Sequence, residues 1–339
     1  MLLDRLWEKG RDFLGVRYPI MCGGMTWVSN LQLMKAVSES GGFPVFAGGN
    51  MPPELFEKEL DSCIMNLGGS FAVNLITIAP NYKIHHDIVK SKKVPIVIYA
   101  GSFPRKTFVE EMKKAGKRTV SFASTKSIAE QMIRFGIDAL ILEGSEAGGH
   151  IGYVSLVILL QQVLFEVQSV PVFVAGGIAR GRMIAHLLTM GAAGCQLGTR
   201  FVTSAECTAH PNFKNAFIKA KARQAIATPQ YDSKLPVVAV RAIKNRAMDE
   251  FGKLQMKLLQ DLGHKRISRE KAQYEVENYW VDSLRRGVVD GDVEGGSLMA
   301  GQSVGLVDNI MPVRDIMQEL VDDAEAELQR MQRLLCKTP

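Results

Sequence analysis

The sequence of 339 residues predicts an α/β protein, a TIM (β/α)8 barrel with a helical cap inserted after the eighth strand. Three observations support this fold class. Short apolar runs alternate with helix-like segments, glycines follow the last two of these runs, and the alternation stops after Val202. Alternation of this kind indicates parallel βα units. A barrel needs ~250 residues, which leaves roughly 90 for a cap.

Each expected strand is a short apolar run bounded by glycine, proline or a charged residue, as buried parallel strands are. In order, the eight runs lie in 19–22, 44–47, 71–75, 94–99, 119–122, 139–142, 174–178 and 196–201. Helices are expected at 31–38, from Pro52 onward, and at 104–115, 127–135 and 182–190, whereas the segment from the third strand to Lys92 is less regular.

An open doubly wound sheet is the competing architecture. It would place a G-x-G-x-x-G turn after its first strand. Gly23 and Gly24 follow the first strand here, but no third glycine has that spacing. Eight repeats also favour closure, so the barrel is preferred.

The chain is expected to divide into a barrel, residues 1–204 plus 305–339, and a cap, residues 205–304. Within the cap, 212–223, 237–262 and 269–287 have helical patterns, and no strand series like that of the barrel is expected. Residues 312–335 are predicted to form a polar amphipathic helix that packs back on the barrel.

Composition narrows the class of protein. The formal charge of +6 permits an acidic partner or a phosphate ligand, but without an arginine-rich tail or lysine run it does not indicate nucleic acid. The five cysteines include no C-x-x-C pair, so no metal site is expected. The first residues lack the apolar core of a signal peptide, and the apolar run 154–167 is too short for a bilayer. We therefore expect a cytoplasmic protein that binds neither membrane nor nucleic acid.

Glycines after the seventh and eighth strands, Gly176, Gly177 and Gly198 with Thr199, predict a phosphate site. In a barrel of this kind the loops after these two strands often bind phosphate. Glycine lets backbone N–H groups approach the phosphate oxygens, and a helix amino end adds partial positive charge. The sequence therefore predicts a phosphate-bearing cofactor.

His150 is the candidate for proton transfer. It follows the sixth strand in a loop with four glycines, which leave its ring open to a ligand. Histidine donates or accepts a proton near neutral pH. A solvated surface histidine is the alternative, but the loop lies on the catalytic face of the predicted barrel.

With these motifs in order, the chain resembles the FMN-dependent nitronate monooxygenase (2-nitropropane dioxygenase) family, which includes the flavin-dependent enoyl-acyl carrier protein reductases. The segments that carry the resemblance are 18–25, 72–75, 143–152, 175–179, 196–201, 210–211 and 291–302. The resemblance implies FMN as cofactor, with His150 as the catalytic proton-transfer residue. The cofactor-binding residues that it implies are Gly23, Gly24, Met25, Asn74, Glu143, Gly148, Gly149, Gly176, Gly177, Gln196, Gly198 and Thr199.

Two positions depart from the family pattern. Relatives often have glutamine where Cys22 stands and aspartate where Arg180 stands. Arg180 is expected either to add a cation near the phosphate or to face solvent. Neither departure removes the phosphate glycines or His150.

The preferred reaction is that of the reductase branch, in which NADH or NADPH reduces FMN and the flavin reduces an enoyl thioester. The motifs Gly48-Gly49-Asn50 and His150-Ile151-Gly152, and the segments 241–245 and 291–302, resemble that branch. The cap is also basic between 212 and 246, with eight Lys or Arg against Asp232 alone, which suits an acidic acyl carrier protein. The basic residues are Lys214, Lys219, Lys221, Arg223, Lys234, Arg241, Lys244 and Arg246.

Other activities stay open at this point. A nitronate monooxygenase, which oxidises alkyl nitronates with O2, is the main alternative, and a phosphate-binding barrel without redox activity is the second. The segments 99–104 and 262–279 do not follow the reductase pattern. Whether the chain forms a homodimer is also left open.

Overall fold

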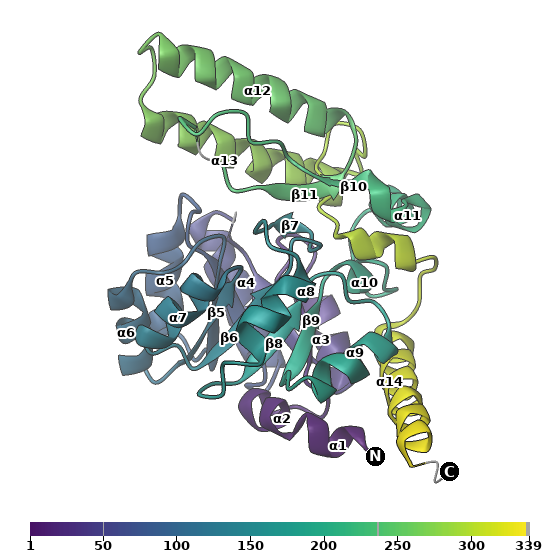
Figure 1. The fold of residues 1–339 in the computed structure, drawn as a ribbon. Helices are drawn as coiled ribbons and strands as arrows, with labels where there is room; N and C mark the ends of the chain where they lie inside the picture. Colours follow the sequence, from purple (N-terminus) through teal and green to yellow (C-terminus); the bar gives the residue numbers. More distant parts are fainter. Residues whose placement is uncertain (50, 236, 337–339) are drawn as a thin grey trace.

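Eight parallel strands close into a barrel, in the order β1-β2-β3-β4-β5-β6-β8-β9 (Figure 1). This computed structural model describes residues 1–49, 51–235 and 237–336, so Asn50 of the Gly48-Gly49-Asn50 motif lies outside the described residues. The strands are β1 Ile20–Cys22, β2 Phe43–Ala47, β3 Ala72–Ile76, β4 Ile96–Ala100, β5 Arg118–Ala123, β6 Ala139–Glu143, β8 Val172–Ala175 and β9 Gly194–Leu197. The predicted barrel is confirmed.

The barrel closes where β1 pairs with β9, Met21 lying opposite Gln196. Its interior is filled by apolar side chains, among them Met21, Phe43 and Phe173. The two short N-terminal helices α1 (Leu3–Leu6) and α2 (Glu8–Leu14) lie at the end of the barrel away from the cap (Figure 1), and Leu14 packs into the interior cluster. This end is therefore closed, and the opposite end is left for a site.

Helices follow the strands on the outside of the barrel. They are α3 Leu31–Glu39, α4 Pro53–Asn66, α5 Tyr82–Ser91, α6 Lys106–Lys114, α7 Lys126–Arg134, α8 Leu156–Leu159 with the π-helical turn Leu160–Leu164, α9 Gly181–Thr189 and the single turn α10 Thr199–Val202. The expectation of an irregular segment before Lys92 was wrong, because α5 is a regular helix. It buries His85 and His86 on its inner face, and these polar residues interrupt the apolar pattern that marks a helix in sequence.

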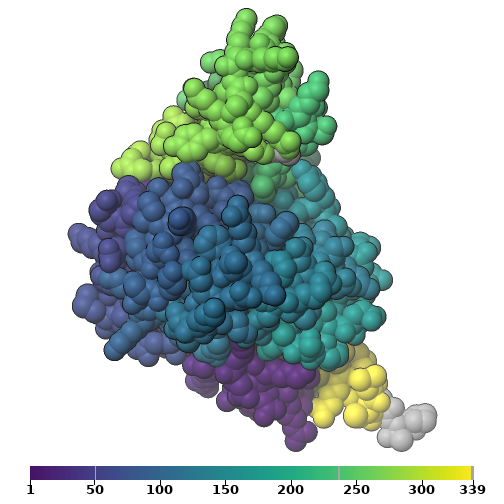
Figure 2. All heavy atoms as spheres, turned by 90° about the vertical axis from the view of Figure 1, so that its left-hand side faces the viewer, coloured from purple at the N-terminus to yellow at the C-terminus, as the bar shows by residue number. Residues whose placement is uncertain are grey.

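The cap stands over the open end of the barrel as a separate lobe (Figure 2). It contains α11 Pro211–Lys219, β10 Ala225–Ala227, β11 Val240–Ile243, α12 Arg246–Gly263 and α13 Arg269–Arg285. The helices α12 and α13 share a small core of their own, in which Phe251 packs against Trp280 with ring centroids 4.2 Å apart and ring planes tilted by 42°.

One predicted cap helix was wrong at its start. Residues 237–262 were expected to be helical, but Val240–Ile243 is the central strand of a three-stranded sheet, β10-β11-β7. The third strand, β7 (Gly149–His150), comes from the loop after β6. Since this sheet joins segments on both sides of the expected boundary at residue 204, the division into two domains stays a prediction.

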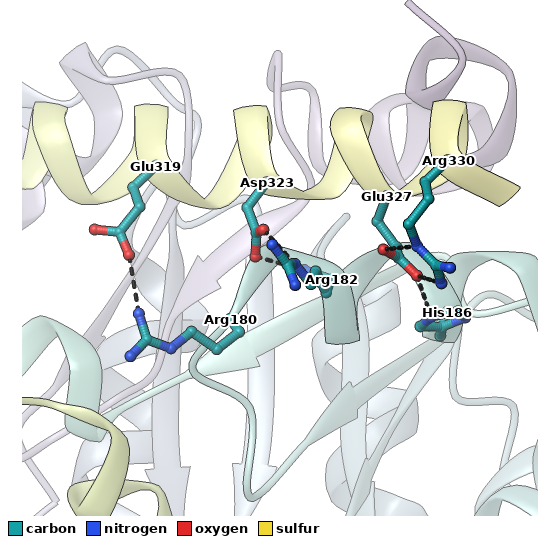
Figure 3. Close-up of polar contacts among 7 residues, drawn as sticks. All are labelled: Arg180, Arg182, His186, Glu319, Asp323, Glu327 and Arg330. Atoms are coloured by element: carbon teal, nitrogen blue, oxygen red, sulfur yellow. Dashed lines mark hydrogen bonds and ion pairs between the residues drawn. The ribbon is translucent and has the colours of Figure 1, made fainter.

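The C-terminal helix α14 (Val313–Leu335) packs along α9, as predicted (Figure 3). The backbones cross closely at Gly181, where an added Cβ would clash with the carbonyl oxygen of Leu320. Asp323 accepts hydrogen bonds from the backbone N–H and from Nε of Arg182, at 2.9 and 2.8 Å. Within the described part of the chain, no helix has the length and apolar character needed to cross a bilayer.

Candidate active site

A cavity lies at the carboxyl ends of the barrel strands, beneath the cap, with about 1230 Å³ of empty space counting its open mouth. All thirteen residues expected from the sequence line it: Gly23, Gly24, Met25, Asn74, Glu143, Gly148, Gly149, His150, Gly176, Gly177, Gln196, Gly198 and Thr199. The cap contributes Phe213, Leu284 and Met299 to the same walls. The structure thus brings the expected residues together around one space.

One side of the cavity is formed by the ends of β1, β3 and β9. An added Cβ at Gly24 would lie 2.7 Å from the Cβ of Asn74, so this glycine is needed for packing within the protein. Asn74 Nδ2 donates to the carbonyl oxygen of Gly24 at 3.5 Å. Asn74 Oδ1 and Gln196 Oε1 are buried and have no hydrogen-bond partner among the described residues. Two unpaired acceptors in a cavity wall fit a ligand that carries N–H donors.

Another part of the cavity wall is formed by the loops after β8 and β9. Gly176 and Gly177 have φ angles of +96° and +72°, which side chains other than glycine rarely adopt. An added Cβ at Gly176 would also lie 3.0 Å from the carbonyl oxygen of Gly144. Gly198 precedes α10, and Thr199 Oγ1 accepts a hydrogen bond from the backbone N–H of Gly301 at 3.1 Å.

At the start of α9, Asp323 of α14 already accepts the N–H of Arg182. Arg180 is half exposed and pairs with Glu319 at 3.3 Å, so it faces α14 and does not line the cavity (Figure 3). The backbone of the two glycine loops is therefore the part of the site that fits a phosphate. Cys22 is buried in β1 and does not line the cavity either.

Glu143 ends β6 and contributes a carboxyl group to the cavity wall. Loss of water around this carboxyl raises its pKa to about 8. The group is therefore mainly protonated near neutral pH, where it donates a hydrogen bond as well as accepting one.

His150 is held by the cap. In the sheet, His150 lies opposite Val240 of β11, and the N–H of Ile151 donates to the carbonyl oxygen of Ala239 at 2.8 Å. Its Nε2 atom lies 3.7 Å from Oε2 of Glu277 on α13. Sequence reasoning missed Glu277, because nothing in a single sequence shows which face of a cap helix turns toward the barrel.

A second meeting of cap and barrel occurs at Gly148 and Gly301. An added Cβ at Gly148 would lie 2.5 Å from the carbonyl carbon of Ala300, and one at Gly301 would lie 2.8 Å from the carbonyl oxygen of Glu146. The segment returning from the cap thus touches the loop that carries His150. Gly301 falls within the segment 291–302, which the sequence resemblance had marked.

Away from the cavity, His86, Asp87 and Glu111 place potential metal-ligating atoms within 4.8 Å of one another. The ammonium group of Lys90 lies 3.1 Å from the carboxylate of Asp87 and 2.8 Å from that of Glu111. The lysine therefore already pairs with both acids.

Comparison with known proteins gives consistent matches. The nitronate monooxygenase family matches residues 66–323. A probable nitronate monooxygenase of Staphylococcus aureus is 26% identical over 96% of this chain and 99% of its own length. FabK from Thermotoga maritima is 32% identical over 95% of this chain and 97% of its own, with a TM-score of 0.84. Nitroalkane oxidase from Streptomyces ansochromogenes is 25% identical over 93% and 98%, with a TM-score of 0.77.

The barrel and its cavity, together with these matches, define a flavin-dependent oxidoreductase. More specifically, the chain belongs to the nitronate monooxygenase family. The alternative of a barrel without redox activity is thereby set aside. Proteins of this family use FMN, and the residues present fit that group: the glycine loops suit its phosphate, and the unpaired acceptors of Asn74 and Gln196 suit the N–H edge of its ring.

Proposed function

We propose that this protein is an NADH- or NADPH-dependent reductase of enoyl thioesters carried by an acyl carrier protein. The observation that carries this proposal is the match to FabK, an enoyl-acyl carrier protein reductase. This match exceeds the match to nitroalkane oxidase in both sequence identity and TM-score. FMN, when bound, accepts a hydride from the nicotinamide and supplies it to the electron-poor double bond. Residues of the chain bind the reactants, orient them and transfer the proton.

Residues in different parts of the cavity have different roles. The backbone at Gly176, Gly177 and Gly198 holds the phosphate, and Asn74 and Gln196 orient the ring edge. His150 donates the proton that balances the added hydride, so the double bond gains one hydrogen on each carbon. Cap side chains such as Leu284 close the space above and exclude water.

The acyl carrier protein would approach the basic segment 212–246 of the cap. Two of the eight basic residues named from the sequence do not belong to that surface: Lys214 is buried and donates to the carbonyl oxygens of Ser204 and Cys207, and Arg241 donates to that of Ser145. The exposed ones are Lys219, Lys221, Arg223, Lys234, Lys244 and Arg246. Six exposed cations still complement an acidic carrier.

The first test is anaerobic mixing of the purified protein with NADH, with NADPH and with an alkyl nitronate, following flavin absorbance. Bleaching by a nicotinamide, and recovery of the colour on adding an enoyl thioester, is the result expected. His150→Ala should keep the flavin and lose turnover. A protein that nicotinamides leave yellow is not this reductase.

Carrier recognition is tested separately. Lys219→Glu with Lys221→Glu should raise KM for a thioester on acyl carrier protein and leave KM for the matching coenzyme A thioester unchanged. Lys257→Glu, on an exposed part of α12 outside the basic segment, is the control. An equal effect on both thioesters would remove the carrier from the proposal.

A nitronate monooxygenase is the second candidate, favoured by the family match and by the Staphylococcus aureus relatives. Bleaching by nitronate alone, with both nicotinamides inert, would assign this activity.

A further inference from the structure

We propose that Glu277 is a positioning residue for His150: its carboxylate accepts a hydrogen bond from Nε2 and so fixes the orientation and tautomer of the ring. The reacting proton is then carried on Nδ1. This proposal rests on the proposed function only in assigning the proton transfer to His150. The pairing of the Glu277 carboxylate with the His150 imidazole is argued from the positions of the two side chains.

The two side chains face each other in a largely enclosed place. His150 Nε2 and Glu277 Oε2 are 3.7 Å apart, and the side chains are 18% and 19% exposed. Nε2 is buried and has no hydrogen-bond partner among the described residues. A distance of 3.7 Å is too long for a hydrogen bond, but such contacts tighten when a site is filled. A buried ring nitrogen facing a carboxylate is the arrangement expected of a pair that closes on binding.

The other charged groups near this loop are engaged elsewhere. The carboxylate of Glu146 accepts the backbone N–H of Leu156 at 3.0 Å. The guanidinium of Arg241 donates to the carbonyl oxygens of Ser145 and Ala225. Glu143 faces the cavity from the end of β6. Glu277 is therefore the carboxylate that the structure leaves for His150.

Both members of the pair are held by the cap. The backbone of His150 pairs with β11. Glu277 stands on α13, which is fixed by a hydrogen bond of 2.6 Å from the Tyr279 hydroxyl to the carbonyl oxygen of Ala247 and by the packing of Trp280 on Phe251. The backbone positions of both residues are therefore set by the fold of the cap.

The chemistry follows from the two nitrogens of imidazole. A carboxylate acceptor favours the proton on Nε2, as in other sites where an acid orients a histidine. In the neutral ring Nδ1 is then an acceptor, and in the protonated ring it is a donor. Without the carboxylate, the proton is free to move to Nδ1 and the ring to rotate, so fewer molecules are ready to react.

The test uses the FMN-loaded protein with 15N-labelled histidine. The ring signals of His150 are assigned by their loss in His150→Ala, and the tautomer of the neutral ring is read from the two nitrogen shifts. Wild type should carry its proton mainly on Nε2. Glu277→Ala and Glu277→Gln should lose this preference, whereas Glu275→Gln, two residues away on the same helix, should keep it.

Kinetics supply the second readout. Both Glu277 variants should lower kcat by about 10- to 100-fold, the loss typical when a partner that orients a functional imidazole is removed, with KM and FMN affinity little changed. Glu277→Asp should recover part of the rate. A tautomer unchanged in both variants overturns the proposal whatever the activity. A changed tautomer in a protein that proves to oxidise nitronates supports it, and the proposed reductase then fails alone.

Discussion

The carboxyl group of Glu143 makes stability depend on pH in a direction opposite to that of most acids. Its pKa is raised from 4.5 to about 8 by burial. Between these values the folded protein binds a proton that the unfolded chain has lost, so the free energy of unfolding falls as the pH rises. Each unit of difference between the folded and unfolded pKa corresponds to about 1.4 kcal/mol. Glu143 therefore lowers the free energy of unfolding by ~3 kcal/mol at pH 7 and by ~5 kcal/mol above pH 8.

Glu143→Gln keeps the size of the side chain and removes this titration. At each pH we expect the free energy of unfolding of the variant to exceed that of wild type by the amount that Glu143 removes. For 339 residues the entropy of unfolding is ~0.7 kcal/mol/K, so Tm should rise by about 7 °C at pH 8.5 and by about 1 °C at pH 5. Calorimetry on both proteins at one free FMN concentration measures this, because bound ligand also raises Tm.

The control for this experiment is Glu166→Gln, which changes an exposed carboxylate and should follow wild type at both pH values. Equal gains of Glu143→Gln at pH 5 and pH 8.5 would refute the reasoning. The carboxyl group would then remain hydrated in the cavity, and its proposed role as a hydrogen-bond donor would be lost with it.

Two further substitutions test other parts of the structure. Gly24→Ala places a Cβ 2.7 Å from that of Asn74 and should displace this side chain, raising the Kd for FMN in a fluorescence titration; an unchanged Kd would show that Asn74 does not contact the cofactor. Glu327→Gln removes the negative charge shared by Arg330 and His186, whose hydrogen bonds lower the pKa of Glu327 to about 2. Its stabilisation is present above pH 4.5 and lost toward pH 2, so urea midpoints of variant and wild type should differ at pH 6 and converge near pH 2.

The barrel and the phosphate glycines could be predicted because their signals are local, whereas cavity residues such as Asn74 and Glu143 were implied by the resemblance to a known family. A parallel strand covered on both faces is apolar throughout, and each of the eight appears in the sequence as a short run with a clear end. Gly176 and Gly177 were visible for the same reason, since a loop that needs positive φ selects glycine at that position. The matching of all thirteen expected residues to one cavity follows from the closed topology, which brings every strand end to one rim.

What could not be predicted depends on contacts between distant segments. Val240–Ile243 is a strand because β7 and β10 lie on either side of it; β7 is far from it in sequence, and residues 228–239 separate it from β10. Helix α5 was missed in the sequence because its inner face includes two buried histidines and is not fully apolar. Lys214 counts as a surface charge in composition but is buried against two carbonyl oxygens.

The cap also positions the loop that carries His150. β7 is two residues long, and a strand this short keeps its geometry through its pairing with β11. The close contact of Gly148 with Ala300 fixes the same loop from its other side. The segment 262–279, which departs from the reductase pattern, is also the one that places Glu277 beside His150. A divergent cap can therefore change the surroundings of His150 while the glycine loops that suit the phosphate stay the same.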